Sequence, residues 1–206
     1  KIIPSKIFKK WAAETNILNY LGVHYIDIMK FVSGAKPVRV MAIGQNNWLK
    51  KNSIKTFDSI QCLIEWKLNK NKFIQNINVN WIDPNNTSSM SDQKIKVIFS
   101  KGRIECDQKN RGIEIISDNN LIEHINPDFN YKFTNYDNLK SSWQGYGINS
   151  ILTFLNDIND IGNKKITINK LNKFRPVFKE AIYSTAILEC ANKSLKNGNE
   201  WIKIIL

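Results

Sequence analysis

The sequence is short of the residues that most often form metal sites and disulfides. Among 206 residues it has two histidines, His24 and His124, and three cysteines, Cys62, Cys106 and Cys190. The cysteines are far apart and odd in number, and no Cys/His spacing matches a zinc site. The sequence therefore argues against a resident metal. It predicts three reduced, buried thiols, as is typical of a cytoplasmic protein.

Long hydrophobic runs are also missing. The longest apolar stretches are interrupted by Lys, Asn or Asp, and none reaches the ~18–20 residues that span a bilayer. The opening KIIPSKIFKKW has no apolar segment of signal-peptide length and does not begin with Met. We therefore expect no membrane partner, and we expect this chain to be part of a longer protein.

Arginine is scarce although the chain is strongly basic. Thirty Lys and Arg residues outnumber 18 Asp and Glu, which gives a net charge of +12, but only four of the thirty are Arg. Proteins that bind nucleic acid usually concentrate Arg and stacking aromatic residues on one face. Because Lys is spread along this chain, we expect no nucleic-acid partner. A basic module that binds polyanions remains an alternative, which salt-dependent retention on DNA would reveal.

A helix is predicted near the N-terminus, over residues 16–33. Apolar residues recur there at helical spacing. Thr15 or Asn16 can cap its N-terminus, and Gly34 stands where a C′ glycine ends a helix.

A block of strands follows, and helices return only near the C-terminus. Short turns join neighbouring strands, and strict alternation over residues 76–81 predicts one buried and one Asn-lined face. This order predicts an α+β fold: an open, mostly antiparallel sheet with helices on one face, in a single domain over residues 1–206. We expect a second copy to cover the other face, in a dimer or tetramer. The predicted strands are 37–45, 56–68, 73–82, 93–100, 103–108, 113–117, 121–125 and 200–206, and the later helices are 147–160 and 174–198.

The first predicted helix carries a candidate for proton transfer. His24 lies in it with Tyr20 one turn before and Asp27 three residues after. A histidine beside a glycine and a carboxylate near a helix start can transfer a proton near neutral pH. A lone helical histidine more often packs in the core or faces solvent, so a structural role stays open.

Three segments of the chain resemble the second domain of the Gfo/Idh/MocA oxidoreductases. GVHYIDIMKFVSGAKPVRVMA resembles the start of that domain, KIKVIFSKGRIECD its central hairpin, and FRPVFKEAIYSTAILECANKSLKNGNEW its closing helix and strand. The resemblance implies the substrate-binding and oligomerising C-terminal domain of a dehydrogenase. A separate Rossmann domain of that family holds NAD or NADP. Neither the GxGxxG turn nor the EKP segment of the family occurs in this sequence.

The resemblance also implies roles for single residues. His24 exchanges a proton with the reacting hydroxyl of a sugar, cyclitol or nucleotide-linked sugar, and Asp27 orients a neighbour or supports the fold. Most members have Asp where this sequence has Tyr20, which either donates a hydrogen bond to the substrate or simply packs. Asp27 is also a candidate for substrate contact. The other candidates are Asn19, Trp81, Asp83, Asp92 and residues 88–93 for substrate contacts, and Trp11 and Asn16 for cofactor contacts.

The change at Tyr20 leaves a second alternative open. A family member that kept the fold and lost the activity would serve as a scaffold. A GxGxxG turn and a Lys-Pro segment encoded upstream would favour the enzyme.

We predict that this chain alone has negligible affinity for NAD(H) or NADP(H). It lacks the glycine-rich turn and the helix N-terminus that hold a pyrophosphate. Calorimetric titration of the chain with either cofactor should give no binding heat. Micromolar affinity would contradict the assignment of the cofactor site to a separate domain.

Overall fold

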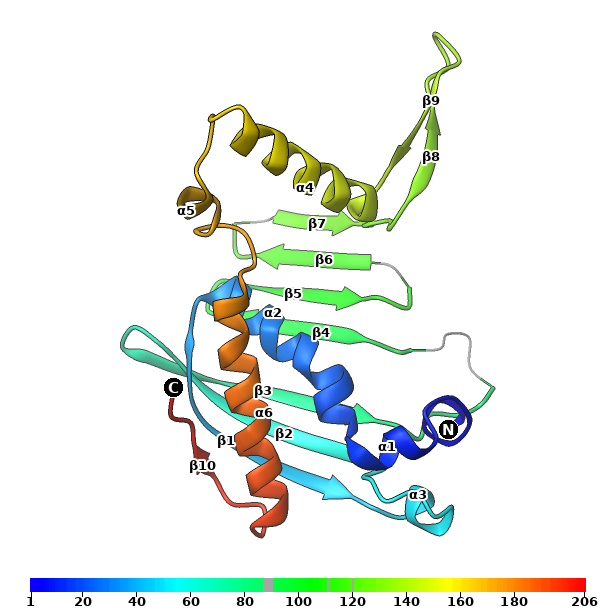
Figure 1. The fold of residues 1–206 in the computed structure, drawn as a ribbon, viewed down its shortest axis with the longest axis vertical. Coiled ribbons are helices and arrows are strands. Elements are labelled where there is room, and N and C mark those ends of the chain that lie inside the picture. Colours follow the sequence, from blue (N-terminus) through cyan, green and yellow to red (C-terminus); the bar gives the residue numbers. More distant parts are fainter. Residues whose placement is uncertain (87–90, 111, 120) are drawn as a thin grey trace. The chain divides into compact units, whose positions relative to one another are not determined.

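The chain folds into helices and antiparallel strands arranged in two units (Figure 1). The computed structural model describes residues 1–86, 91–110, 112–119 and 121–206. Unit 1 comprises Lys1–Thr87 and Pro176–Leu206, and unit 2 comprises Ser88–Arg175. The predicted α+β class is confirmed. The expectation of a single domain over residues 1–206 stays a prediction.

Unit 1 is built on a four-stranded sheet, named sheet A, in the order β10-β1-β2-β3. All of its pairings are antiparallel, as the short turns predicted. Its strands are β1 (Lys36–Gln45), β2 (Ser59–Leu68), β3 (Asn71–Asn80) and β10 (Ile202–Lys203). The last strand is shorter than the predicted 200–206.

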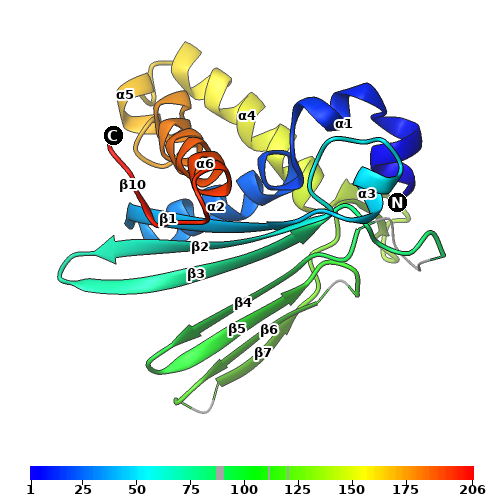
Figure 2. The same ribbon diagram turned by 90° about the horizontal axis from the view of Figure 1, so that it is seen from below.

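One face of sheet A forms the core of unit 1. Two helices, α2 (Val23–Ser33) and α6 (Ala181–Lys196), lie across this face (Figure 2). Fully burying one large aliphatic side chain stabilises a fold by ~1.5–3 kcal/mol, so this face is the main source of stability in unit 1. The buried strand residues are Val40, Ala42, Ile60, Cys62, Ile64, Trp66, Ile77 and Val79.

For the two long helices of unit 1, one predicted end is confirmed and one predicted start is wrong. Gly34 has φ +65° and its N–H donates to the carbonyl of Lys30, which confirms the glycine stop. The predicted start of the last helix near Pro176 is wrong. Val177 is extended, so helical structure begins only at Phe178. The short helical segments of unit 1 are η1 (Ile3–Ile7), α1 (Lys10–Glu14), η2 (Leu18–Gly22), α3 (Trp48–Lys51) and η3 (Phe178–Glu180).

The opposite face of sheet A mixes polar and apolar side chains. The predicted alternation in β3 is confirmed, since Asn76, Asn78 and Asn80 are exposed while Ile77 and Val79 between them are buried. At the centre lies Glu65, whose carboxylate is paired with Lys72 at 2.6 Å and Arg39 at 2.8 Å. The hydrogen bond from Lys72, followed by that from Arg39, lowers the pKa of Glu65. The carboxylate therefore stays ionised and ties three strands together.

Unit 2 contains a four-stranded antiparallel meander, named sheet B. Its strands are β4 (Lys94–Phe99), β5 (Gly102–Asp107), β6 (Gly112–Ser117) and β7 (Leu121–Ile125). One face carries ion pairs such as Lys96–Glu105 at 2.8 Å. The register makes the opposite face mostly apolar, and none of its apolar residues is buried: Ile95, Val97, Phe99, Ile104, Cys106, Ile113, Ile115, Leu121 and Ile125.

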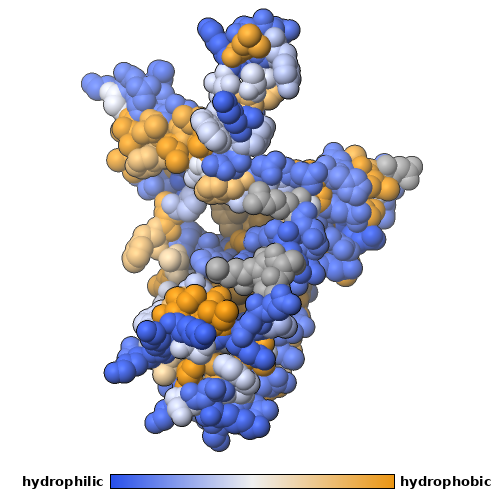
Figure 3. All heavy atoms as spheres, turned by 90° about the vertical axis from the view of Figure 1, so that its right-hand side faces the viewer, coloured by the Kyte–Doolittle hydropathy of each residue, from blue (hydrophilic) through white to orange (hydrophobic). Residues whose placement is uncertain are grey.

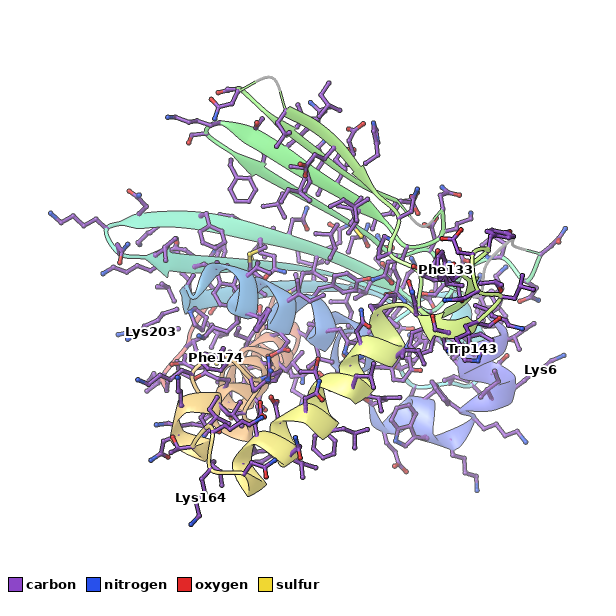
Figure 4. The ribbon with its side chains drawn as sticks, turned by 90° about the horizontal axis from the view of Figure 1, so that it is seen from above. Lys6, Phe133, Trp143, Lys164, Phe174 and Lys203 are labelled. Atoms are coloured by element: carbon purple, nitrogen blue, oxygen red, sulfur yellow. The ribbon has the colours of Figure 1, made fainter. Side chains whose placement is uncertain are left out.

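The rest of unit 2 is a hairpin followed by helices. The sequence did not predict the hairpin, β8 (Tyr131–Thr134) with β9 (Ser141–Gln144), nor α5 (Ile168–Leu171). Its strands are only four residues long and their aromatic residues, among them Phe133 and Trp143 in Figure 4, are exposed. Helix α4 (Tyr146–Gly162) extends the predicted 147–160 at both ends.

A buried carboxylate explains why β2 starts at Ser59 and not at residue 56. Asp58, only 2% exposed, accepts hydrogen bonds from the backbone N–H groups of Asn47, Trp48 and Leu49, each at 2.7 Å. These donors open α3, and a helix start leaves such N–H groups without helical partners. Asp58 therefore serves as a cap from outside the helix and leaves the strand pattern.

We predict that Asp58→Ala lowers the free energy of unfolding by about 2–3 kcal/mol, because three backbone donors, of which that of Leu49 is buried, lose their acceptor. Urea denaturation of the chain measures the loss. Asp137→Ala, in an exposed turn, is the control and should stay within ~0.5 kcal/mol of the wild type. Equal stabilities of the two variants would contradict the capping role.

Candidate functional site

The segment that precedes α2 is a π turn. Residues Leu18–Gly22 form η2, and α2 continues directly at Val23. The side chain of Asn16 accepts a hydrogen bond from the N–H of Asn19 at 3.0 Å, which confirms its predicted role as a cap. A Cβ on Gly22 would lie 2.5 Å from Cδ1 of the fully buried Leu18, so a larger residue would require the Leu18 side chain to shift. Single π turns are rare overall, and those that occur are often found at functional sites.

His24 lies in the first turn of α2 and is exposed. Ile26 on the same helix is fully buried, so the face that carries His24 and Asp27 points away from the core. Among the residues that the structure describes, the imidazole forms no hydrogen bond and no ion pair, including with Asp27. His24 is therefore not a packed core histidine, and its ring nitrogens are available to a ligand.

Three of the candidate residues meet in one group, named the aromatic cluster: Phe8, Trp11, Tyr20 and Trp81. Tyr20 stacks on Trp81 with ring centroids 5.3 Å apart and planes at 23°. Phe8 meets Tyr20 edge-to-face at 5.0 Å and Trp11 at 4.8 Å. Such pairs contribute ~0.5–1.5 kcal/mol beyond their buried area. Phe8 had no predicted role, although its place three residues before Trp11 is a helical spacing.

The members of the aromatic cluster differ in what a ligand can reach. Trp11 and Tyr20 are 45% and 41% exposed, whereas Trp81 is 4% exposed. Tyr20 packs against other rings, which is one of the two alternatives given for it. The exposed part of its side chain leaves the other alternative, a hydrogen bond to the substrate, open. The buried indole of Trp81 lies beneath the ring of Tyr20. Its predicted contact with substrate is untested, and this burial disfavours it.

The indole N–H of Trp81 is buried, and within the described ranges it has no hydrogen-bond acceptor. An unsatisfied buried donor costs ~1–3 kcal/mol. The stacking of Tyr20 and the edge contact of Phe8 at 5.8 Å hold the indole in place in spite of that cost.

Two further candidates form part of a ring of amide side chains. The Nδ2 of Asn16 donates to Oδ1 of Asn192 at 2.8 Å, and the Nδ2 of Asn192 donates to Oδ1 of Asn19 at 3.2 Å. The bond from Asn19 N–H to Asn16 closes the ring. Because Asn16 is 9% exposed and bonded at both ends of its amide, a direct cofactor contact by Asn16 is disfavoured and stays a prediction. Asn192, on α6, was missed because nothing in a helical pattern marks one Asn among several.

Within the described residues, the remaining candidates take part in none of these ring contacts and amide hydrogen bonds. Asp92 is an exposed residue of unit 2, and its carboxylate lies 3.4 Å from Nζ of Lys94. Asp83 follows β3 in unit 1 and is half-buried. Residues 88–90 lie outside the described residues. Within the described ranges, no three His, Cys, Asp or Glu side chains are grouped so as to hold a metal ion.

The cysteines are unpaired, as the sequence predicted. Cys62 and Cys190 are buried and Cys106 is half-buried. Burial raises the pKa of the Cys62 thiol to about 12. That thiol therefore stays protonated and unreactive at neutral pH.

The site and its fold can be compared with known proteins. The site has an exposed helical histidine beside a π turn, and helices cover one face of the sheet in the same unit. Residues 3–105 match the family model described as the GFO/IDH/MocA C-terminal domain. The chain belongs to this family. The resemblance expected from the sequence is confirmed, and the half of the chain that matches includes the whole aromatic cluster and His24.

Solved structures of Gfo/Idh/MocA-type oxidoreductases share the fold. An inositol dehydrogenase homologue from Azotobacter vinelandii, in complex with NADH and myo-inositol, matches with a TM-score of 0.64 and 16% identity over 94% of this chain and 52% of its own. An oxidoreductase from Pseudomonas syringae matches with a TM-score of 0.64 and 16% identity over 91% and 51%. UDP-N-acetylglucosamine 3-dehydrogenase from Acidithiobacillus ferrooxidans matches with a TM-score of 0.55 and 16% identity over 92% and 48%.

The chain spans about half the length of these solved structures. No curated protein sequence matches it. Over the described residues, no helix is long and apolar enough to cross a membrane. The chain is therefore placed by its fold and family as a C-terminal domain of Gfo/Idh/MocA oxidoreductases.

Proposed function

We propose that this chain is the substrate-binding part of an NAD- or NADP-dependent dehydrogenase that acts on a CH–OH group of a sugar, cyclitol or nucleotide-linked sugar. The observation that carries the proposal is the exposed imidazole of His24, which follows the π turn and has no partner among the described residues. The family supports the reaction class, and the inositol and nucleotide-sugar dehydrogenases among its structural neighbours support the substrate class.

The residues of this chain divide the work as follows. A nicotinamide cofactor, when bound, supplies the hydride acceptor or donor. Trp11 fits contact with such a cofactor, because the residue is 45% exposed and its indole can stack on a planar ring. His24 removes the hydroxyl proton when the alcohol is oxidised and returns it in the reverse direction. Tyr20 presents its exposed side to the substrate, while its stacking on Trp81 fixes the ring.

Two features bear on the alternatives to this function. The packing of Tyr20 in the aromatic cluster is also what an inactive scaffold would retain, so turnover by the full-length protein decides between enzyme and scaffold. Lysines such as Lys6, Lys164 and Lys203 extend outward from separate elements (Figure 4). This spread favours a solvated basic surface over a polyanion-binding module. We also propose a cytoplasmic location, which the three unpaired cysteines support.

We predict that His24→Asn in the full-length protein lowers turnover by ~10²-fold or more, because the reacting hydroxyl loses its proton acceptor. Steady-state kinetics measures the turnover. The reaction is followed by the absorbance of the reduced nicotinamide cofactor at 340 nm. The melting temperature and the cofactor affinity should stay close to those of the wild type.

His124→Asn provides the matched control, since His124 is the second histidine of the chain and lies exposed on β7. Its turnover should equal that of the wild type. Turnover of His24→Asn within a factor of ~3 of the wild type, under ~1 kcal/mol of barrier, would show that His24 transfers no proton.

We further propose that the open face of sheet A packs against a second copy of this chain. In unit 1 the described helices lie on the other face (Figure 2), and this face exposes Ile43 by 47% and Ile74 by 54%. The side of the molecule in Figure 3 shows separate hydrophobic clusters within a mostly hydrophilic surface. Apolar side chains on an open sheet face are covered at lower free energy by a partner than by water.

The expected assembly is a dimer or tetramer at ~100 μM, a concentration well above the dissociation constants of stable oligomers. Ile74→Lys should shift the mass by light scattering toward the monomer, because it puts a charge into the interface. Ile205→Lys, at a residue that is 82% exposed near the C-terminal end, should leave the mass unchanged. A wild-type chain that is strictly monomeric at this concentration would rule the assembly out.

A further inference from the structure

The amide ring joins two elements that are far apart in the sequence. Asn16 and Asn19 precede and open the π turn η2, and Asn192 lies on α6. Asn192 uses both ends of its amide, accepting from Asn16 at 2.8 Å and donating to Asn19 at 3.2 Å. The two residues that it holds are three positions apart, which fixes the first turn of the segment.

The residue that follows His24 is held by a hydrogen bond from a different element. The Nε2 of Gln75 on β3 donates to the carbonyl oxygen of Tyr25 in α2 at 2.9 Å, and its Oε1 accepts from the indole N–H of Trp66 at 3.0 Å. Helix α2 is therefore tied to sheet A next to His24. The orientation of η2 relative to α2 then still has to be fixed. The side-chain hydrogen bonds of this segment run to α6.

The type of turn in η2 decides where Tyr20 points relative to His24. A π turn contains about one residue more than an α turn, and it is rare as an isolated conformation. If η2 relaxed to α geometry, the residues of its N-terminal part, Tyr20 included, would rotate relative to α2 by up to about 100°, the angle of one helical residue. Tyr20 would then leave its stacked position on Trp81. A bond network from outside the turn is needed to prevent this.

We propose that Asn192 is a positioning residue, which holds the π turn η2 and so sets Tyr20 against Trp81 and at a fixed orientation to His24. Asn192 lies on another element and acts through Asn16 and Asn19. Its effect on the orientation of Tyr20 follows from the hydrogen bonds alone, whereas its effect on catalysis rests on the function proposed above.

The indole N–H of Trp81 provides a probe for this role. It is buried beneath Tyr20, so the ring current of Tyr20 contributes to its proton resonance. In ¹⁵N-labelled chain the Trp81 indole signal is assigned by its loss in Trp81→Phe. Asn192→Ala should shift this signal and speed its exchange with solvent, while the indole signal of Trp66 keeps its position.

Two further variants complete the test. Asn163→Ala is the matched control, because Asn163 also donates to another Asn side chain, Asn159 at 3.0 Å, on an exposed surface. It should leave the Trp81 signal in place. Asn19→Ala removes the acceptor of Asn192 from a half-buried position, and it decides the question if Asn192→Ala does not fold. Asn192→Asp keeps the acceptor for Asn16 and loses the donor to Asn19, so its shift should be smaller than that of Asn192→Ala.

An unchanged Trp81 signal in folded Asn192→Ala, or in Asn19→Ala if the former does not fold, overturns the proposal. An equal shift in Asn163→Ala overturns it as well. In the full-length protein, Asn192→Ala should lower kcat about tenfold or more with cofactor affinity unchanged, because a displaced group misses the reacting geometry. A shifted Trp81 signal with unchanged kcat would leave Asn192 as the residue that positions Tyr20. It would instead contradict a part for Tyr20 in the proposed reaction.

Discussion

The burial of one face of sheet A beneath α2 and α6 is the constraint on which the rest of unit 1 depends. Period-two strands supply that face, and Ile26 of α2 and Ile187 of α6 are fully buried against it. Because a helix of fixed pitch can bury only one stripe, burying Ile26 forces His24 and Asp27 outward. The orientation of the candidate proton-transfer group is thus a consequence of core packing.

Buried polar groups then fix elements that apolar packing alone leaves free to slide. Ser194 of α6, fully buried, accepts from the N–H of Ala42 at 3.0 Å and donates to the carbonyl of Glu200 at 2.6 Å. This bond pair ties α6 to both β1 and the segment leading to β10. Asp58 and Gln75 do the same for α3 and α2. The burial of apolar surface is non-directional, whereas a hydrogen bond has a narrow range of lengths and weakens steeply once its angle falls below ~120°.

The candidate site combines a family feature with an unusual neighbour. His24, to which the resemblance assigns proton transfer, is exposed, and Tyr20 stands one turn before it, where the resemblance implies a carboxylate. The structure gives that tyrosine a defined place, stacked on Trp81 and bordered by Phe8 and Trp11. The side chains around this position therefore form a neutral aromatic surface. Such a surface suits the apolar face of a sugar or cyclitol ring, in keeping with the proposed substrates.

The sequence by itself determined what depends on local pattern: the antiparallel pairing, the alternating face of β3, a cap at Thr15 or Asn16, the glycine stop at Gly34 and the family membership carried by residues 22–42. It did not determine what depends on distant partners. The start of β2 is set by Asp58 capping α3, and the helix start at 176 fails because Val177 is extended. The aromatic cluster and the ring of Asn16, Asn19 and Asn192 join residues up to 176 positions apart. Periodicity reports only which face a side chain takes, so these contacts were decided by tertiary packing.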